Sequence, residues 1–351
     1  MTRLSLYYAK MKSQGDPPLR ILITGGAGFI GSNFVKMILD NKLGGSLQEV
    51  TVIDKLTYSG NKENLSEYLD DPRLKFVVGD ICDPSTVAKV MANQDAVVHF
   101  AAESHVDRSI LSSFDFIRTN VLGTEILLSS ALQNNVKTFV HVSTDEVYGS
   151  IAIGKWNEDF PLLPNSPYAA SRAASDLLVR SYGITHNLDV RITRCSNNYG
   201  PYQYPEKVIP LFITNLIDGK SIPMYGTGEN IREWIHVDDH CRAIFSVLLN
   251  GKANNIYNIA GMTELTNLQL SHKILDLMNQ PHSKIDFVTD RKAHDQRYAL
   301  DSTKIEGEIG FKPAHRFEDG LRETIDWYLN NESWWRPLLA PNNMEIKNDS
   351  R

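Results

Sequence analysis

The stretch Ile21-Leu-Ile-Thr-Gly-Gly-Ala-Gly-Phe-Ile-Gly31 decides the fold of this chain. An apolar run of strand type leads into a G-x-G-x-x-G turn, and a segment of helical period follows through Asn33–Asp40. Glycines in such a turn let the backbone approach a pyrophosphate, whose negative charge the N-terminus of the next helix favours. The stretch therefore predicts the first strand, turn and helix of a dinucleotide-binding domain of Rossmann type.

Other short apolar runs alternate with segments of helical period from Arg20 onward. This alternation is typical of βαβ units and predicts an α/β fold, with a doubly wound parallel sheet covered by helices on both faces. Ligands of such sheets bind beyond the carboxyl ends of the strands, where this chain has small and polar residues. We expect strands at Ile21–Thr24, Val50–Ile53, Lys75–Val78, Ala96–Phe100, Thr138–Val142 and Val190–Thr193.

The alternation becomes less regular beyond about residue 200, and helical periods return around 263–280 and 318–330. We expect an NAD-binding domain over residues 20–194 with about 228–260, the latter segment crossing back to it. A smaller mixed α/β domain, which would bind the substrate, comprises residues 195–227 and 261–335. Residues 1–19 and 336–351 are expected to be tails.

Composition limits the classes of function. The chain has 351 residues, 42% of them hydrophobic, with a net charge of -6 and acids and bases mixed along its length. Because a basic stripe is missing, nucleic acid is not an expected partner. The three cysteines, Cys82, Cys195 and Cys241, are too widely spaced for a zinc site or a disulfide framework, which favours a reducing compartment such as the cytoplasm and predicts no metal.

The first nineteen residues lack the continuous apolar core of a secretory signal. Arg3, Lys10 and Lys12 precede any acid, so organelle targeting is the alternative to a simple tail. No apolar stretch is long enough to span a bilayer, and we expect no membrane association.

The end of the second predicted strand bears on the choice of dinucleotide, and a later segment predicts a further helix. Asp54 ends the second predicted strand, at the offset where an acid meets the adenosine ribose diol and repels a 2′-phosphate, so NAD is favoured over NADP. Ser166 and Pro167 predict a helix start, with Gly183 as its C-cap.

Tyr168 and Arg172 lie four residues apart near the start of that helix and therefore share a face. A phenol titrates near pH ~10 and can serve as a base near neutrality only where cations stabilise the phenolate. The pair therefore indicates a tyrosine base supported by a cation.

These motifs resemble the extended short-chain dehydrogenase/reductase superfamily. Within it, the chain closely resembles the dTDP-glucose 4,6-dehydratase family from about Arg20 to Trp327. The resemblance implies bound NAD and a homodimer joined through helices near Thr119–Leu132 and Ala170–Tyr182. It rests on five stretches: Asp54–Asn61, Ala101–Ser109, Ser143–Gly149, Ser196–Pro201 and His294–Tyr298.

The adjacent acids Asp145 and Glu146 distinguish a dehydration from simpler reactions of the superfamily. Once C4 of a hexose is a ketone, its C5 proton is acidified, so elimination of the 6-hydroxyl needs both a base and an acid. By the resemblance, Glu146 is the base, Asp145 the acid and Thr144 the partner of Tyr168. The chain has to turn after Thr144 for both acids to reach one sugar.

The resemblance also implies two sets of binding residues. Those for NAD are Gly25, Gly28, Phe29, Ile30, Gly31, Asp54, Lys55, Asp80, Ile81, Ala101, Ala102, Tyr168, Arg172 and Cys195. Those for the sugar nucleotide are Ser104, Asn120, Asn197, Glu206, Lys207, Tyr225, Arg232 and Arg297, with Glu103 and Asp107 along the sugar.

One catalytic position departs from the family, which has lysine where this chain has Arg172. Arginine keeps the charge but presents a wider planar fork than an ammonium, so we expect slower turnover and a faster Arg172→Lys variant.

Three alternatives to a dTDP-glucose dehydratase remain at this point. They are a UDP-glucose 4,6-dehydratase, a sugar-nucleotide 4-epimerase or decarboxylase, and a non-catalytic sugar-nucleotide-binding protein.

Overall fold

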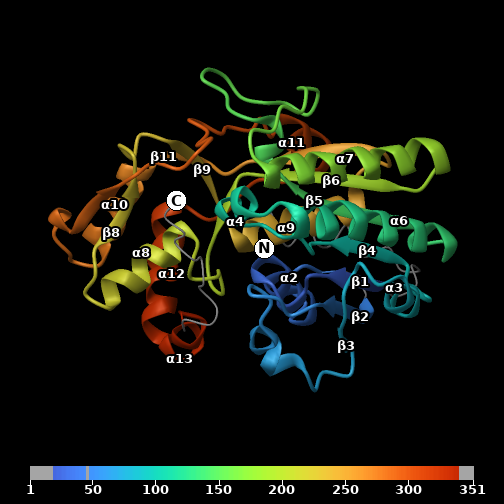
Figure 1. The fold of residues 1–351 in the computed structure, drawn as a ribbon. Helices are drawn as coiled ribbons and strands as arrows, with labels where there is room; N and C mark the ends of the chain where they lie inside the picture. Colours follow the sequence, from blue (N-terminus) through green and yellow to red (C-terminus); the bar gives the residue numbers. More distant parts are fainter. Residues whose placement is uncertain (1–18, 45–46, 340–351) are drawn as a thin grey trace.

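A seven-stranded parallel sheet forms the centre of the larger lobe (Figure 1). The computed structural model describes residues 19–44 and 47–339. Every strand that the sequence predicts in this sheet is confirmed. In spatial order the strands are β10 (Asn255–Ile259), β6 (Val190–Cys195), β5 (Thr138–Thr144), β4 (Ala96–His99), β1 (Leu19–Thr24), β2 (Leu47–Asp54) and β3 (Leu74–Val78).

Helices cover both faces of this sheet, as the doubly wound fold requires (Figure 1). Alternate residues of β1 face opposite layers, with Ile21 and Ile23 in one apolar core and Leu22 in the other. The first core is closed by α2 (Phe29–Leu39), α9 (Val237–Asn250) and α11 (Thr303–Ile309). The second is closed by α3 (Pro84–Met91), α6 (Thr124–Gln133) and α7 (Pro167–His186). Burial on both faces explains why the strands are continuous apolar runs rather than alternating ones.

The smaller lobe has its own apolar core and two small sheets. A mixed sheet orders β11 (Thr263–Thr266), β9 (Ile231–His236) and β7 (Asn197–Tyr199), and a parallel pair joins β12 (Ile285–Val288) to β8 (Ile222–Tyr225). Its helices are α8 (Val208–Ile217), α10 (Asn267–Leu277), α12 (Phe317–Asn330) and α13 (Glu332–Trp335). The helical period expected from residue 263 begins only at Asn267, because Thr263–Thr266 pairs with β9 and Thr266 then caps the helix.

Short helical segments link these elements. They are η1 (Lys62–Tyr68), α4 (Val106–Leu111), α5 (Phe114–Phe116), η2 (Ile117–Gly123), η3 (Asp145–Tyr148), η4 (His282–Lys284) and η5 (Arg336–Leu339). The return to the large sheet, expected from about residue 228, begins at α9 instead, since β9 pairs with β7 and β11. Of the expected tails, Leu19 begins β1 and η5 is helical, while residues 1–18 and 340–351 lie outside the described residues.

The helix predicted from Ser166 is confirmed at its start and wrong at its end. The Ser166 side chain accepts a hydrogen bond from the Ala169 N–H, and Pro167 is the first helical residue. The helix continues past Gly183 to His186 and ends at Asn187, which has a φ of 56°. Gly183 is instead a packing position, because a Cβ there would lie 2.0 Å from Oδ1 of Asn254.

Among the described residues, no helix is both long and apolar enough to cross a membrane.

Candidate active site

A cleft with a cavity of about 310 Å³ lies at the carboxyl ends of the large sheet, where β1 separates β2 from β4. This is the point at which the strand order reverses, and doubly wound sheets bind their ligands there. Every residue that we predict for NAD lines the cavity, as do Thr144, Asp145 and Glu146. Of the predicted sugar-nucleotide residues, the cavity wall includes Ser104, Asn197 and Lys207.

The glycine turn after β1 leaves no room for side chains. Gly25 has a φ of 71°, and a Cβ there would lie 2.6 Å from the backbone nitrogen of Ala101. A Cβ on Gly31 would lie 2.3 Å from the carbonyl oxygen of Gly25. The turn therefore brings bare backbone and the start of α2 to the cavity, which is the arrangement that receives a pyrophosphate.

Asp54 occupies the end of β2 beside this turn. Its carboxylate accepts hydrogen bonds from the backbone N–H groups of Ala27 at 2.9 Å and Leu56 at 2.8 Å. Burial raises the pKa of Asp54, while these two bonds oppose the rise. The nearby ammonium of Lys55 is paired with Asp80 at 2.9 Å, so it is not free to bind a 2′-phosphate. The charged groups at this end of the cavity therefore fit NAD, which has no 2′-phosphate.

Tyr168 and Arg172 are both buried, one turn apart on α7. One terminal nitrogen of Arg172 donates to the carbonyl of Val142 and lies 3.4 Å from Nε2 of His141. Its other terminal nitrogen is buried and has no hydrogen-bond partner among the described residues. Burial, and then the charge of Glu146, raise the pKa of Tyr168, whereas Arg172 and a hydrogen bond with Thr144 lower it. Arg172 alone therefore does not offset the burial of the phenol.

Thr144 ends β5 and starts the tight turn η3, so the predicted turn after Thr144 is confirmed. Its hydroxyl accepts a hydrogen bond from the Glu146 N–H at 3.2 Å and donates to Oδ1 of Asp145 at 3.2 Å. This capping turn brings both acids to the cavity wall.

The two acids differ in their electrostatic surroundings. Burial, then the charges of Glu146 and Glu233, raise the pKa of Asp145 well above its ordinary value. Burial also raises the pKa of Glu146, but the cations Arg232, Lys207 and Arg291 oppose it. Asp145 is thus the member that holds a proton, and Glu146 the one that cations favour as a carboxylate.

Cations from the smaller lobe approach the acids from the other side of the cleft. Lys207 is partly buried and donates to the Ser104 carbonyl at 2.9 Å. Arg232 lies over the Tyr298 ring, 4.2 Å from its centroid. Arg291 pairs with Asp107 of α4 at 3.1 Å and lies 5.6 Å from the ring centroid of Tyr225.

Arg291 is a candidate residue that the sequence interpretation missed, although it lies three positions before the motif that begins at His294. The structure directs the predicted residue, Arg297, elsewhere. Its guanidinium donates to Glu264 at 2.8 Å and to the Gly154 carbonyl at 2.9 Å. Neither arginine is part of the cavity wall, but the charge of Arg291 acts on Glu146.

Two other predicted substrate residues are engaged in internal contacts. Asn120 is fully buried and bonds the backbone of Glu103 in both directions, at 2.9 and 3.1 Å, and the Ser171 hydroxyl at 2.8 Å. Glu206 accepts from Arg108 at 3.1 Å. Asn120 therefore positions the segment after β4 at the edge of the cleft.

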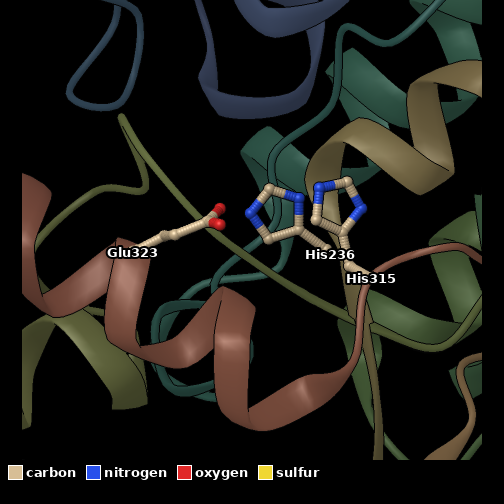
Figure 2. Close-up of side chains that lie close together, drawn as sticks. All are labelled: His236, His315 and Glu323. Atoms are coloured by element: carbon tan, nitrogen blue, oxygen red, sulfur yellow. The ribbon is translucent and has the colours of Figure 1, made fainter.

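A second polar cluster joins β9 to α12, outside this cleft. Figure 2 shows the carboxylate of Glu323 pointing toward His236, with the His315 ring stacked behind at 4.2 Å and 22°. Nδ1 of His236 accepts from the Asp238 N–H at 3.3 Å, which leaves the ring proton on Nε2. Because Nε2 then offers no lone pair and the two rings are nearly parallel, the cluster lacks the converging lone pairs that a metal ion requires.

The chain matches known proteins over most of its length. The family model described as GDP-mannose 4,6 dehydratase matches residues 22–324. A dTDP-glucose 4,6-dehydratase from Streptomyces niveus is 56% identical over 324 residues, which is 92% of this chain and 96% of that protein. One from Escherichia coli is 45% identical, covering 90% of this chain and 94% of that protein.

Solved structures show the same relationship. The dTDP-glucose 4,6-dehydratase from Streptomyces venezuelae, with NAD and dTDP bound, superposes with a TM-score of 0.90 at 56% identity, covering 91% of this chain and all of that one. A UDP-glucose 4-epimerase from Thermotoga maritima gives 0.82 at 27% identity, covering 89% and 99%. The chain therefore belongs to the GDP-mannose 4,6 dehydratase family and, within it, to the dTDP-glucose 4,6-dehydratases of the extended short-chain dehydrogenase/reductase superfamily.

Proposed function

We propose that this protein is an NAD-dependent hydro-lyase that converts dTDP-glucose into dTDP-4-keto-6-deoxyglucose. The observation that carries the proposal is the pair Asp145 and Glu146, brought to one cavity wall by the turn η3 and placed in opposite electrostatic surroundings. An epimerase or a simple dehydrogenase needs no such pair, whereas a dehydration needs an acid and a base on neighbouring carbons.

The cavity residues at the end of β1, β2 and β3 would hold NAD, with Asp54 on the adenosine ribose and the glycine turn on the pyrophosphate. NAD, when bound, accepts hydride from C4 and returns it to C6, so the reaction has no net redox change. The second terminal nitrogen of Arg172, which lacks a partner among the described residues, is available for the nicotinamide ribose.

The chain's own residues move the protons. Tyr168 takes the proton of the 4-hydroxyl, supported by Arg172 and Thr144. Glu146 then removes the C5 proton, which the new ketone has acidified, while Asp145 protonates the departing 6-hydroxyl. Glu146 finally returns its proton to C5.

The nucleotide diphosphate lies, in this proposal, between the cations that face the cleft. Arg232 and Arg291 suit phosphate oxygens, since guanidinium groups bind them in fixed directions. Lys207 and Asn197 line the cavity nearby, and the half-exposed ring of Tyr225 is placed to stack on the base. Uracil differs from thymine by one methyl group, a small difference for a pocket to detect, so UDP-glucose is the second candidate substrate.

The protein is further proposed to be a homodimer. Large apolar side chains are exposed within the segments Thr119–Leu132 and Ala170–Tyr182, where the resemblance places the partner, and on elements that adjoin them in sequence: Leu111, Phe114, Ile117, Leu122, Leu177 and Ile184. A patch of this kind marks an interaction surface. The cytoplasm is the proposed location, in keeping with three cysteines that are all free thiols.

Mass spectrometry after incubation of the NAD-loaded protein with dTDP-glucose or UDP-glucose tests this function. We expect loss of one water from dTDP-glucose without lasting absorbance of NADH. The Glu146→Gln variant should bind dTDP as the parent does but release no water. An unchanged mass with the parent protein, despite binding of dTDP, would overturn the proposal.

A further inference from the structure

After one cycle of the proposed reaction, the protonation states of Tyr168 and Asp145 differ from those at its start. Over one cycle Tyr168 gains the proton of the 4-hydroxyl, and Asp145 loses one to the departing water. Glu146 takes a proton from C5 and later gives one back, so its own protonation state does not change over the cycle. Before the next cycle one proton must therefore travel from the Tyr168 phenol to the Asp145 carboxylate.

Both groups are shielded from solvent. Tyr168 is 8% exposed and Asp145 is 2% exposed, even with the cleft open. A sugar nucleotide that fills the cleft would separate them further from bulk water. A return path inside the protein would avoid this obstacle.

Thr144 connects the two groups. A hydroxyl has one proton to donate and two lone pairs that accept. Thr144 donates its proton to Oδ1 of Asp145 and accepts from the Glu146 N–H, both at 3.2 Å. Thr144 also shares a hydrogen bond with Tyr168 that lowers the pKa of the phenol, which is the effect of a hydroxyl that turns to donate to the phenolate. With Tyr168 protonated and Asp145 a carboxylate, as the proposed reaction leaves them, the donors run in one direction, from Tyr168 through Thr144 to Asp145.

We propose that Thr144 is a proton relay that restores Tyr168 and Asp145 to their starting protonation states by returning a proton from Tyr168 to Asp145 inside the protein. The O–H bond of Tyr168 breaks as a new O–H bond forms on Thr144. The original O–H bond of Thr144 breaks as one forms on Oδ1 of Asp145. No electrons are transferred and no further reactant is consumed.

A half-turn of the Asp145 carboxyl then presents the proton to the next substrate. Oδ2 of Asp145 is buried and has no hydrogen-bond partner among the described residues, so no contact there resists the rotation. The Thr144 hydroxyl thereby orients Tyr168, the base of the first step, and returns a proton to Asp145 after the last step. This inference rests on the proposed dehydration, since an epimerase would leave no such imbalance.

The test is rapid-quench kinetics of NAD-loaded Thr144→Val with dTDP-glucose in excess over sites. Valine keeps the shape of threonine but has no hydroxyl. We expect a fast phase of about one product per site, slowed by no more than about tenfold through the lost hydrogen bond. Later turnovers should be at least about 100-fold slower than that phase, because the reset then depends on solvent.

Thr144→Ser is the matched control and should show no fast phase, because serine restores the hydroxyl. Imidazolium buffer, a small proton donor, should accelerate the later turnovers of Thr144→Val and leave the parent unchanged. If valine prevents uptake of NAD, Thr144→Ala replaces it in the same experiment. A first turnover slowed as much as the later ones would overturn the relay, while a parent that releases no water would overturn the proposed function instead.

Discussion

Two buried aspartates illustrate how position decides the charge of the same side chain. Burial, and then the charges of Glu146 and Glu233, raise the pKa of Asp145 well above the ordinary value, and the smaller opposing effect of Arg232 does not offset them. Asp176 bonds Arg194 at 2.8 Å, and this cation, with His141, outweighs burial and lowers the pKa of Asp176 to about 2. One aspartate is built to keep a proton, and the other to remain an anion.

These opposite shifts predict opposite effects on stability. A raised folded-state pKa stabilises the protein below the unfolded pKa of ~3.9 and loses that contribution as pH rises. Asp145→Asn should therefore stabilise the protein by about 1–3 kcal/mol at pH ~8, with the gain shrinking toward pH ~4. Thermal unfolding across this range measures it. Asp145→Asn that is no more stable than the parent at pH ~8 would show that the carboxyl is not held neutral.

Asp176→Asn is the control, and its expected effect on the stability of the protein has the opposite sign. A lowered pKa contributes stability that is present above the unfolded value of ~3.9 and is lost as pH falls toward about 2. Asp176→Asn should therefore cost about 3–5 kcal/mol, evenly between pH ~5 and ~8, because it leaves the buried Arg194 unpaired.

The cations of the cleft allow a matched comparison. Arg291→Ala should weaken dTDP binding by at least about tenfold, since each charged hydrogen bond to phosphate is worth about 1.5–3 kcal/mol. Arg297→Ala should leave the dissociation constant within about threefold, because its guanidinium is engaged with Glu264 and Gly154. Calorimetry of dTDP binding to both variants measures the difference. Equal losses would contradict the assignment of Arg291.

Residue types and spacing predicted the cavity wall well, because Gly25, Gly31 and Asp54 act through backbone geometry that local sequence encodes. Side chains that reach across the cleft were less predictable. Arg291 and Arg297 both lie near the same motif. Only the fold shows that Arg297 pairs with Glu264, whereas Arg291 pairs with Asp107.

The helix α7 shows the same limit for a secondary-structure element. Its start was predictable, since Ser166 and Pro167 act on their immediate neighbours. Its end was not, because Gly183 is small for a tertiary reason, the approach of Asn254 and Val190. A glycine therefore marks a helix end only where nothing packs against it.

Two helical glycines should consequently respond to alanine with opposite signs. At Gly183 a Cβ would lie 2.0 Å from Asn254 and 2.6 Å from Val190, so Gly183→Ala should cost about 1–3 kcal/mol. At Gly307 in α11 nothing lies within 4 Å, so Gly307→Ala should stabilise by about 0.5–1 kcal/mol. Thermal unfolding of both variants checks the signs, and stabilisation by Gly183→Ala would refute the packing explanation.

The larger lobe presents an apolar surface that one copy of the chain leaves exposed. Leu177 of α7 is 57% exposed and Ile117 of η2 is 55% exposed, beside the helices that the resemblance places in a dimer. The alternation of strands and helices was enough to predict the sheet. It did not predict that β9 joins the smaller lobe, because that depends on pairing with strands distant in sequence.

A charge on this surface should separate the dimer. Leu177→Asp should lower the mass measured by light scattering from that of two chains to that of one, because a carboxylate would be buried without a partner. Ile153→Asp alters an apolar residue that is 90% exposed in the loop between η3 and α7, and it should leave the mass unchanged. A parent that has the mass of one chain would contradict the dimer.

The whole molecule is proposed to move one hydrogen from C4 to C6 of the same sugar, in a cleft lined by residues of both lobes. The most direct measurement uses dTDP-glucose carrying deuterium at C4. We predict that the 4-keto-6-deoxy product retains the deuterium at C6. Product that lacks deuterium at C6, or label recovered at C4 of an epimerised sugar, would contradict the account.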